Sequence, residues 1–373
     1  MSKNIFKKIE KLNISHEQND YMPIIFNLKK ESDIKLVNRL IKEKKIIAVI
    51  DEFCEQKNEF RIVKNPRRLF LHPSTKKYHN KTDAENGKWI YFPWRFSLVH
   101  ILDFNDFVKL RSSRNKDLIR EVEQKKYAAA KIGIAGLNVG NPAALCMALE
   151  GGGRVMKFAD NDVLSLSNLN RFRASLIDLG LNKAILSARQ VYEVDPYYQI
   201  KVFPRGIISG KTREFLMKPR IDVLVEEMDN LPLKIEMREE ARKNRIPVVM
   251  VTGNGENVII DIERFDQNSQ LPFLNGHLKP SIIKAIKKGS LDTIPMKQRV
   301  LMARDFMGVK FLTKRLNDSF QLVGTNLAGI PQIAESSFLR GAAVAYCVRQ
   351  IVTGKKLLSG RYFLNLSDIT IKR

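Results

Sequence analysis

The stretch "KIGIAGLNVGNPAALCMALEGGGRVMKFAD", from Lys131 to Asp160, decides the fold of this chain. A short apolar run turns at Gly136 into an apolar helical stretch, and a second apolar run ends at Asp160. A strand, a crossover helix and a second strand in this order predict a parallel pair of strands. Ligands of such sheets bind at the carboxyl ends of the strands. We therefore expect functional residues after Ala135 and Ala159.

The same alternation continues along the chain, where "IKVFP", "IDVLVEEM" and "PVVMV" are separated by helical stretches. This pattern predicts an α/β fold with a doubly wound, mostly parallel, Rossmann-like sheet. Residues 1–105 differ, because they combine basic helical stretches with short apolar or aromatic runs such as "KIIAVIDEF" and "KWIYFPWRFSLVHIL". We expect a smaller, basic N-terminal α/β domain over 1–105 and the large sheet over 106–373.

Composition excludes several classes of protein. No apolar run approaches the eighteen or so residues of a membrane helix, and the charged amino terminus lacks a signal sequence, so we expect a cytoplasmic protein with no membrane partner. Cys54, Cys146 and Cys347 lie far apart, which argues against disulfides and against zinc. The net charge of +24 comes from lysines spread over the whole chain, which favours a solvated surface over nucleic-acid binding.

The turn after the first strand predicts phosphate binding. Gly136 and Gly140 stand where the strand passes into a helix, and a helix amino terminus attracts anions. Asp160 follows about twenty residues later, the usual distance for a carboxylate that binds the ribose of an adenosine. A dehydrogenase would share both features, and many α/β proteins have a two-glycine turn with no nucleotide.

Residues further along favour ATP over a dinucleotide. Arg171 and Lys183 supply two cations, which suit three phosphates better than a single pyrophosphate. Asp229 follows the strand "IDVLVEE", where a carboxylate can hold Mg²⁺ against the phosphates. Each residue also has a purely structural interpretation: Asp162 as a turn former, Asn168 and Asp229 as helix caps, and the two cations as surface charges.

Taken in order, these motifs resemble the ThiF, MoeB and HesA adenylyltransferases, to which the ubiquitin-activating enzymes are related. The resemblance covers about residues 110–373. It is carried by the glycine turn and by "ADNDVLSLSNLNR", "GLNKA", "VLVEEMDN" and "GIPQIAESSFLRGAAVAYCVRQIVTGK". It implies a doubly wound fold in a homodimer or pseudo-dimer. It also implies an enzyme that uses ATP and Mg²⁺ to adenylate a carboxylate, usually that of a ubiquitin-like or sulfur-carrier protein.

The resemblance also implies a role for each matching residue. Asp160 would bind the ribose, Asn168 and Arg171 the phosphates, and Lys183 the α-phosphate. Asp229 would hold Mg²⁺. Arg114, in "RSSRN", is similar to an arginine that reaches the phosphates of the neighbouring subunit, which implies a homodimer. The implied catalytic residues are Arg171, Lys183, Asp229 and Arg114, and the implied nucleotide-binding residues are Gly136, Gly140, Asp160, Asp162, Asn168 and Asn170.

Three departures from the family pattern narrow the chemistry. Asn138, Val139 and Asn141 stand where glycines are expected, and the paired C-x-x-C zinc motifs of many sulfur-carrier members are missing. Cys347 is the one cysteine downstream of the nucleotide motifs, and its apolar surroundings predict a core residue rather than an acceptor thiol. We therefore expect the chemistry to end at an acyl-adenylate or its phosphate-linked equivalent, which is captured by a group other than a protein thiol.

The leading hypothesis is activation of a carboxylate on a ribosomally made precursor peptide, as in members of the family that mature antibiotics of the microcin and pantocin kind. The domain over 1–105 would then hold an acidic peptide, or else merely pack against the rest. The alternatives are adenylation of a sulfur carrier, a tRNA threonylcarbamoyladenosine dehydratase, and a non-catalytic binding module. His277 is a weak candidate for a general base, and Glu226 and Glu227 indicate local electrostatics.

Overall fold

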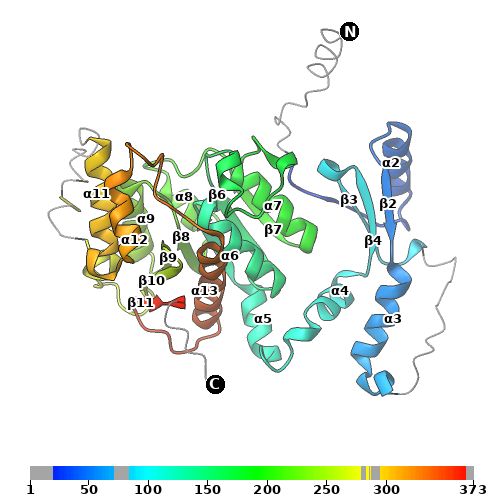
Figure 1. The fold of residues 1–373 in the computed structure, drawn as a ribbon. Coiled ribbons are helices and arrows are strands. Elements are labelled where there is room, and N and C mark those ends of the chain that lie inside the picture. The colour runs from blue at the N-terminus through cyan, green and yellow to red at the C-terminus, as the bar shows by residue number, and fades with distance from the viewer. Residues whose placement is uncertain (1–19, 71–83, 279–282, 285, 287–294, 367–373) are drawn as a thin grey trace, which may run out of the picture.

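The structure is a computed structural model that describes residues 20–70, 84–278, 283–284, 286 and 295–366. Parts of the predicted N-terminal domain, 1–19 and 71–83, therefore lie outside the described residues. The described chain forms two sheets with helices around them, and Figure 1 shows the smaller sheet to one side of the larger. Within the described ranges, no helix combines the length and the apolar character needed to cross a membrane.

The smaller sheet has four strands in the order β1-β3-β4-β2. Its elements are β1 (Ile24–Phe26), α2 (Glu31–Lys42), β2 (Ala48–Asp51), α3 (Phe53–Lys64), β3 (Lys88–Phe92) and β4 (Ser97–Ile101). β2 runs parallel to β4, and the other pairs are antiparallel. The His100 ring is stacked between Phe53 and Trp89, with ring centroids 4.1 and 4.2 Å apart. This stack fixes α3 against the sheet.

The larger sheet has seven strands in the order β11-β10-β9-β8-β5-β6-β7. They are β5 (Lys131–Ala135), β6 (Val155–Ala159), β7 (Gln199–Phe203), β8 (Val223–Glu226), β9 (Val248–Asn254), β10 (Asn257–Glu263) and β11 (Gly360–Leu364). The pairs from β7 to β9 are parallel, and β10 and β11 extend the sheet in antiparallel fashion. The α/β fold with a mostly parallel sheet is confirmed.

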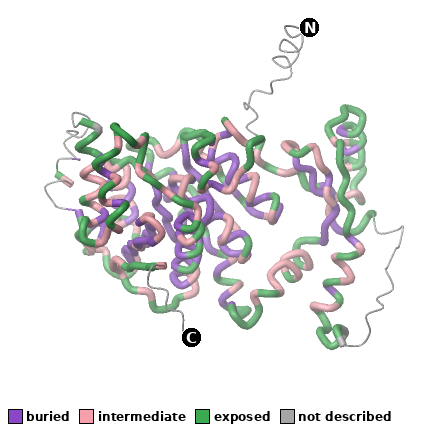
Figure 2. The backbone as a smooth tube through the Cα atoms, viewed as in Figure 1, coloured by how far each residue is buried: buried purple, intermediate pink, exposed green. Residues whose placement is uncertain are grey.

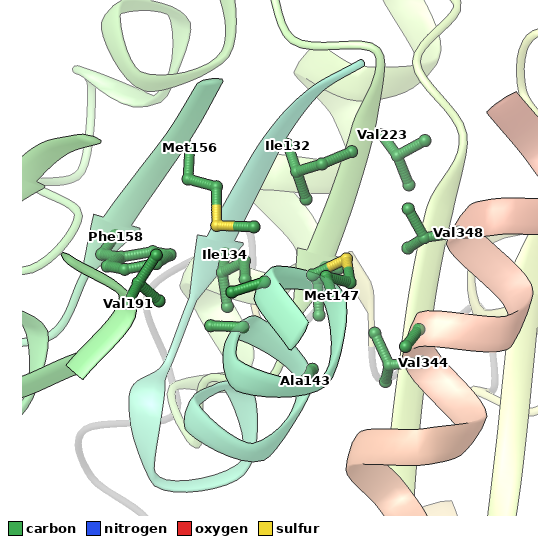
Figure 3. Packing of buried hydrophobic residues seen from close by; sticks show 14 of the residues in the cluster. Ile132, Ile134, Ala143, Met147, Met156, Phe158, Val191, Val223, Val344 and Val348 are labelled. Carbon is green, nitrogen blue, oxygen red and sulfur yellow. The ribbon is translucent and has the colours of Figure 1, made fainter. Parts of the chain in front are cut away.

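Helices cover both faces of this sheet, as a doubly wound fold requires. Two helices, α4 (Phe104–Arg111) and α5 (Glu121–Ala129), precede the first strand of this sheet. The helices between and after its strands are α6 (Leu137–Leu149), α7 (Lys183–Val194), α8 (Thr212–Met217), α9 (Leu231–Lys243), α11 (Met296–Met307), α12 (Lys314–Leu322) and α13 (Ala334–Val352). On one face, Ile132 and Ile134 of β5 pack with Met147, Val191 and Val344 from α6, α7 and α13 (Figure 3).

The other face of the sheet packs against α8 and α9. Ala135 and Leu224, which alternate with the residues of the first face, lie in one apolar cluster with Phe215, Ile235 and Met237. Figure 2 shows that buried residues concentrate around the large sheet. Strand residues with both faces covered read as continuous apolar runs, which is why the sequence predicted this sheet.

The last helix of the fold, α13, lies along α6. A Cβ atom placed on Gly341 of α13 would lie 2.6 Å from the side chain of Pro142, so only glycine permits this approach. The smaller sheet contacts the larger sheet's helix α7. Arg95, which lies between β3 and β4, forms an ion pair with Glu193 of α7 at 2.8 Å. The Tyr197 hydroxyl donates to the carbonyl of Leu102 at 3.0 Å.

Candidate active site

The turn between β5 and α6 brings the helix amino terminus onto the edge of the sheet. Gly136 has a φ of +90°, and a Cβ atom placed on it would lie 2.5 Å from the carbonyl carbon and oxygen of Glu227. A Cβ atom on Gly140 would lie 2.4 Å from the side chain of Ile134. Both predicted nucleotide-binding glycines therefore permit close packing of α6 on β5 and β8, which is the role that the structure shows for them.

Asp160 lies at the end of β6 beside this turn. One of its oxygens accepts a hydrogen bond from the Leu137 amide at 2.6 Å, and the other accepts from the Asp162 amide at 2.8 Å. Burial raises the pKa of Asp160, although these two amides oppose the shift. A carboxylate oxygen can accept more than one bond, so the Asp160 side chain retains capacity to bind ribose hydroxyls.

Lys183 is the first residue of α7, and its side chain is buried against Asp162. The Lys183 ammonium lies 2.9 Å from the Asp162 carboxylate, whose side chain is 64% exposed. Asn182 caps the helix by accepting from the amides of Ala184 and Ile185. Its amide group donates to the carbonyls of Asp160 and Asp162, so it ties this loop to the strand end. Sequence analysis missed Asn182, although an asparagine before a helix is a typical N-cap.

The side chains of Asn168 and Asn170 hold the loop that follows β6. Asn168 accepts from the Ser165 amide at 3.1 Å and so caps a 3-10 turn, as its structural interpretation predicts. Asn170 donates to the Gln332 carbonyl at 2.8 Å and accepts from the Arg171 guanidinium at 2.8 Å. The loop is thereby connected to the segment before α13, which lies far along the chain.

Three arginines, Arg171, Arg173 and Arg340, form a guanidinium cluster around the start of α13. The Ser337 hydroxyl donates to the Arg171 carbonyl at 3.0 Å, and Arg173 lies within 3.5 Å of the same hydroxyl. Burial lowers the pKa of all three arginines, that of Arg173 to about 10. Within the described chain, each has a buried guanidinium nitrogen with no hydrogen-bond partner. Such a cluster is suited to bind an anion.

A cavity of about 370 Å³ opens beside this cluster. It lies between the ends of β8 and β9, α11, and the start of α13, and Asn138 and Val139 of α6 also line it. Its charged lining residues are Glu227, Asp229, Lys234, Arg299 and Arg340, and its apolar ones include Met228, Leu231, Met250, Met302, Phe306, Met307, Ile330 and Pro331. Asp160, Asp162, Lys183 and Arg171 are not among its lining residues, so the predicted site is divided between this cavity and the loop after β6.

Asp229 connects the two halves of the site. Its carboxylate partly offsets the effect of burial on the pKa of Arg171, and together with Glu227 it does the same for Arg340, so Asp229 lies near both guanidinium groups. The Asp229 side chain is exposed and lines the cavity. A single carboxylate fits Mg²⁺, which proteins commonly hold through one or two carboxylates together with substrate phosphates.

Glu226 and Glu227, which are adjacent in sequence, have different environments. Burial raises the pKa of Glu226, but Lys234 and Arg238 outweigh burial and lower it overall. Arg238 also bonds Glu263 at 2.7 Å, which makes a buried ion network under the sheet edge. Glu227 lines the cavity, accepts from the Val251 amide at 2.8 Å, and has its pKa raised to about 8 by burial. Burial therefore favours the protonated form of the Glu227 side chain.

Three further predicted residues lie away from this edge. Arg114 is exposed, and its neighbour Asn115 donates to the Glu150 carbonyl beyond the carboxyl end of α6. Since α6 is about 20 Å long, Arg114 lies at the end of that helix remote from Gly136. His277 is exposed and does not line the cavity. Cys347 is buried in the main core, with its pKa raised to about 12 by burial, which confirms the prediction of a core residue.

Comparison with known proteins gives a family match over part of this chain. The model of the ThiF family matches residues 111–261. Uncharacterized protein MT1398 of Mycobacterium tuberculosis is 31% identical over 95% of this chain. The chain spans 47% of the length of that relative.

Two more distant matches agree with the fold. A probable molybdopterin-synthase adenylyltransferase of Porphyra purpurea is 29% identical over 28% of this chain and 27% of its own length. Among solved structures, the crystal structure of PaaA matches with a TM-score of 0.50 and 19% identity, over 71% of this chain and 79% of that one. At this identity the match shows a shared fold.

Proposed function

This chain carries a ThiF-family domain, and from that premise we propose that it uses Mg·ATP to adenylate a carboxylate on a peptide or small protein. One observation carries the proposal. Asp160 beside α6, the Lys183–Asp162 pair, and the guanidinium cluster that faces Asp229 all lie at the carboxyl edge of the parallel strands. These groups can bind a ribose, a set of phosphates and a metal ion.

The reaction assigns a task to each group. One oxygen of the substrate carboxylate bonds to the α-phosphorus of ATP. The bond from that phosphorus to the bridging oxygen breaks, and pyrophosphate leaves with the electron pair. Lys183 and Arg171 would stabilise the negative charge that develops on the phosphates, which is commonly the largest contribution in such reactions. Mg²⁺ held at Asp229 would neutralise the leaving pyrophosphate. No general base is needed, because a carboxylate is already ionised at neutral pH.

The proposal includes a homodimer. Arg114 lies near the end of α6 remote from Gly136, so in its own subunit it is far from the phosphate-binding edge. The family resemblance assigns this arginine to the phosphates of the neighbouring subunit, and its position is compatible with that role. Mixing an inactive Lys183→Met subunit with an inactive Arg114→Ala subunit would restore activity in mixed dimers, whereas no recovery would contradict a shared site.

The proposal also gives the smaller sheet a role in holding a precursor peptide. Among the described residues β2 is an edge strand, paired on one side with β4, and Ile47, Val49 and Ile50 are large exposed side chains on or beside it. An exposed apolar edge can pair with an extended peptide segment. Lys42 and Lys44 nearby are exposed and would favour acidic residues on that peptide.

The test is pyrophosphate release from Mg·ATP with and without short peptides encoded beside the gene, followed by mass spectrometry of the peptide. We expect peptide-dependent formation of AMP and a change in peptide mass. Lys183→Met should reduce release by about 10²-fold or more, while Lys356→Met, which removes an exposed lysine, should leave it unchanged. Release with a carrier ending in Gly-Gly or with tRNA, and with no peptide, would overturn the peptide assignment. No turnover under any condition would overturn adenylation.

A further inference from the structure

We infer that the cavity between β8, β9, α11 and α13 binds the C-terminal residue of the substrate, and that this residue carries a bulky apolar side chain beside the carboxylate to be activated. The inference rests on the proposed function. It goes further by naming the class of substrate, a peptide with a free C-terminal carboxylate on a residue such as methionine, leucine or phenylalanine. A glycine at this position would leave most of the cavity unfilled.

One side of the cavity is built from large apolar side chains. Met250 comes from β9, and Met302, Phe306 and Met307 come from a single face of α11. Met250 and Met307 are almost completely buried. Methionine side chains adapt to irregular apolar partners, and a cavity of about 370 Å³ falls within the range of small-ligand pockets. This wall therefore suits a large apolar side chain.

The other side of the cavity presents a buried cation. Arg340 is 4% exposed and lines the cavity, and its Nε atom has no hydrogen-bond partner in the described part of the chain. Within the described residues, its guanidinium group donates a long hydrogen bond, 3.4 Å, to the side-chain oxygen of Gln332. A buried guanidinium group with unsatisfied donors binds a carboxylate well, because two parallel hydrogen bonds can form. Arg340 is thus the group that would orient the substrate carboxylate.

The cavity also adjoins the phosphate-binding groups. Asn138 and Val139, the second and third residues of α6, line it, and helix N-termini leave such amides unsatisfied by the helix itself. Asp229, the proposed magnesium ligand, lines the same cavity. A carboxylate held by Arg340 would consequently lie on the side of the cavity from which the α-phosphate can be approached, with its apolar side chain directed to α11.

The test uses N-acetyl-Ala-Ala-Ala-X peptides, with X as Met, Leu, Phe, Ala or Gly, and the C-terminal amide of the Met peptide. Dissociation constants are measured by calorimetry on the full chain, with and without a non-hydrolysable ATP analogue. We expect the Met, Leu and Phe acids to bind about 10- to 100-fold more tightly than the Gly acid. The amide should bind at least about tenfold more weakly than the acid. Equal affinities across X, or no binding by any acid, would overturn the inference.

Variants test the apolar wall of the cavity and its Arg340 side independently. Met302→Gln should reduce the preference for Met over Gly and leave the preference for acid over amide. Arg340→Met should remove the preference for acid over amide and leave the preference for Met over Gly. Arg340→Lys should restore part of the preference for acid over amide. Leu358→Gln, at an exposed site outside the cavity lining, is the matched control. Thermal unfolding of each variant identifies any that fail to fold, and unchanged preferences in folded Met302→Gln and Arg340→Met would contradict the assignment.

Pyrophosphate release with the same peptides distinguishes the two proposals. Selective binding without release of pyrophosphate would leave the cavity assignment standing and would overturn adenylation. Release that is fastest with the Gly acid would support adenylation and overturn the assignment of a bulky apolar residue.

Discussion

The ammonium group of Lys183 lies 2.9 Å from the carboxylate of Asp162, and these two side chains differ sharply in exposure, 5% for Lys183 and 64% for Asp162. The lysine is therefore held in place by a partner that water can reach. An incoming phosphate can share or replace this partner without leaving a buried charge unpaired, since Asp162 can be solvated on its own. Under the proposed function, the pair would serve as a preformed cation site for a phosphate group.

Replacing Lys183 should separate activity from stability. Lys183→Met removes a buried charge and leaves Asp162 exposed, so we expect little change in the melting temperature. Pyrophosphate release should fall by about 10²-fold or more, because one phosphate-binding cation is lost. Lys183→Arg should retain part of the activity. A large drop in the melting temperature of Lys183→Met would show that the pair is mainly structural.

Replacing Asp229 tests the proposed magnesium site. Asp229→Asn keeps the shape of the side chain but removes its charge, so the magnesium concentration for half-maximal pyrophosphate release should rise and the maximal rate should fall. Asp318→Asn, at an exposed position on α12, is the control and should leave both quantities unchanged. Normal magnesium dependence in Asp229→Asn would contradict the assignment of the metal ligand.

The conformation of Gly136 predicts that Gly136→Ala lowers the free energy of unfolding by more than ordinary backbone strain would. Gly136→Ala places a Cβ atom at a φ of +90° and against the Glu227 backbone, whereas Gly354→Ala has a similar φ, +76°, and no atom within 4 Å. Strain alone costs about 1–3 kcal/mol. Urea unfolding should therefore show a larger loss of stability for Gly136→Ala than for Gly354→Ala. Equal losses would mean that the contact with Glu227 relaxes easily.

Glu227 predicts a dependence of stability on pH. Burial raises its pKa to about 8 in the folded chain, against an ordinary value of 4.5. Between these two values the folded state binds more protons than the unfolded state, so stability falls as pH rises from about 4.5 to 8. Glu227→Gln keeps the neutral form at every pH. The free energy of unfolding in urea should therefore be higher for Glu227→Gln than for the parent, by a difference that grows between pH 5.5 and 8. A difference that stays constant would count against the raised pKa.

The parts of the fold that could be predicted are those encoded locally. β5, α6 and β6 follow from one continuous alternation of apolar runs, and Asp160 follows from its position at the end of the second strand. The antiparallel strands β10 and β11 could not be predicted in the same way, because their pairing joins residues about a hundred positions apart. Such pairings depend on tertiary context rather than on local pattern.

The same distinction applies to the site. Lys183 and Asp229 stand next to recognisable strand and helix ends, so sequence analysis found them. Arg173 and Arg340 were missed, since nothing in the local sequence marks either arginine until α13 places Arg340 near Arg173. The cavity was missed because α11 and the segment before α13 build one side of it. The two glycines were found, but the structure shows them packing α6 against the sheet.

The close approach of Gly341 to Pro142 has a consequence for how the molecule is made. The proposed nucleotide-binding half of the site, from Gly136 to Lys183, leaves the ribosome well before α13 is synthesised. Until then, α6 lacks the helix that covers its flank, and Arg171 lacks the hydroxyl of Ser337 that holds its carbonyl. The proposed site is therefore completed late in synthesis. A nascent chain whose α13 has not yet emerged from the ribosome should be unable to bind ATP tightly.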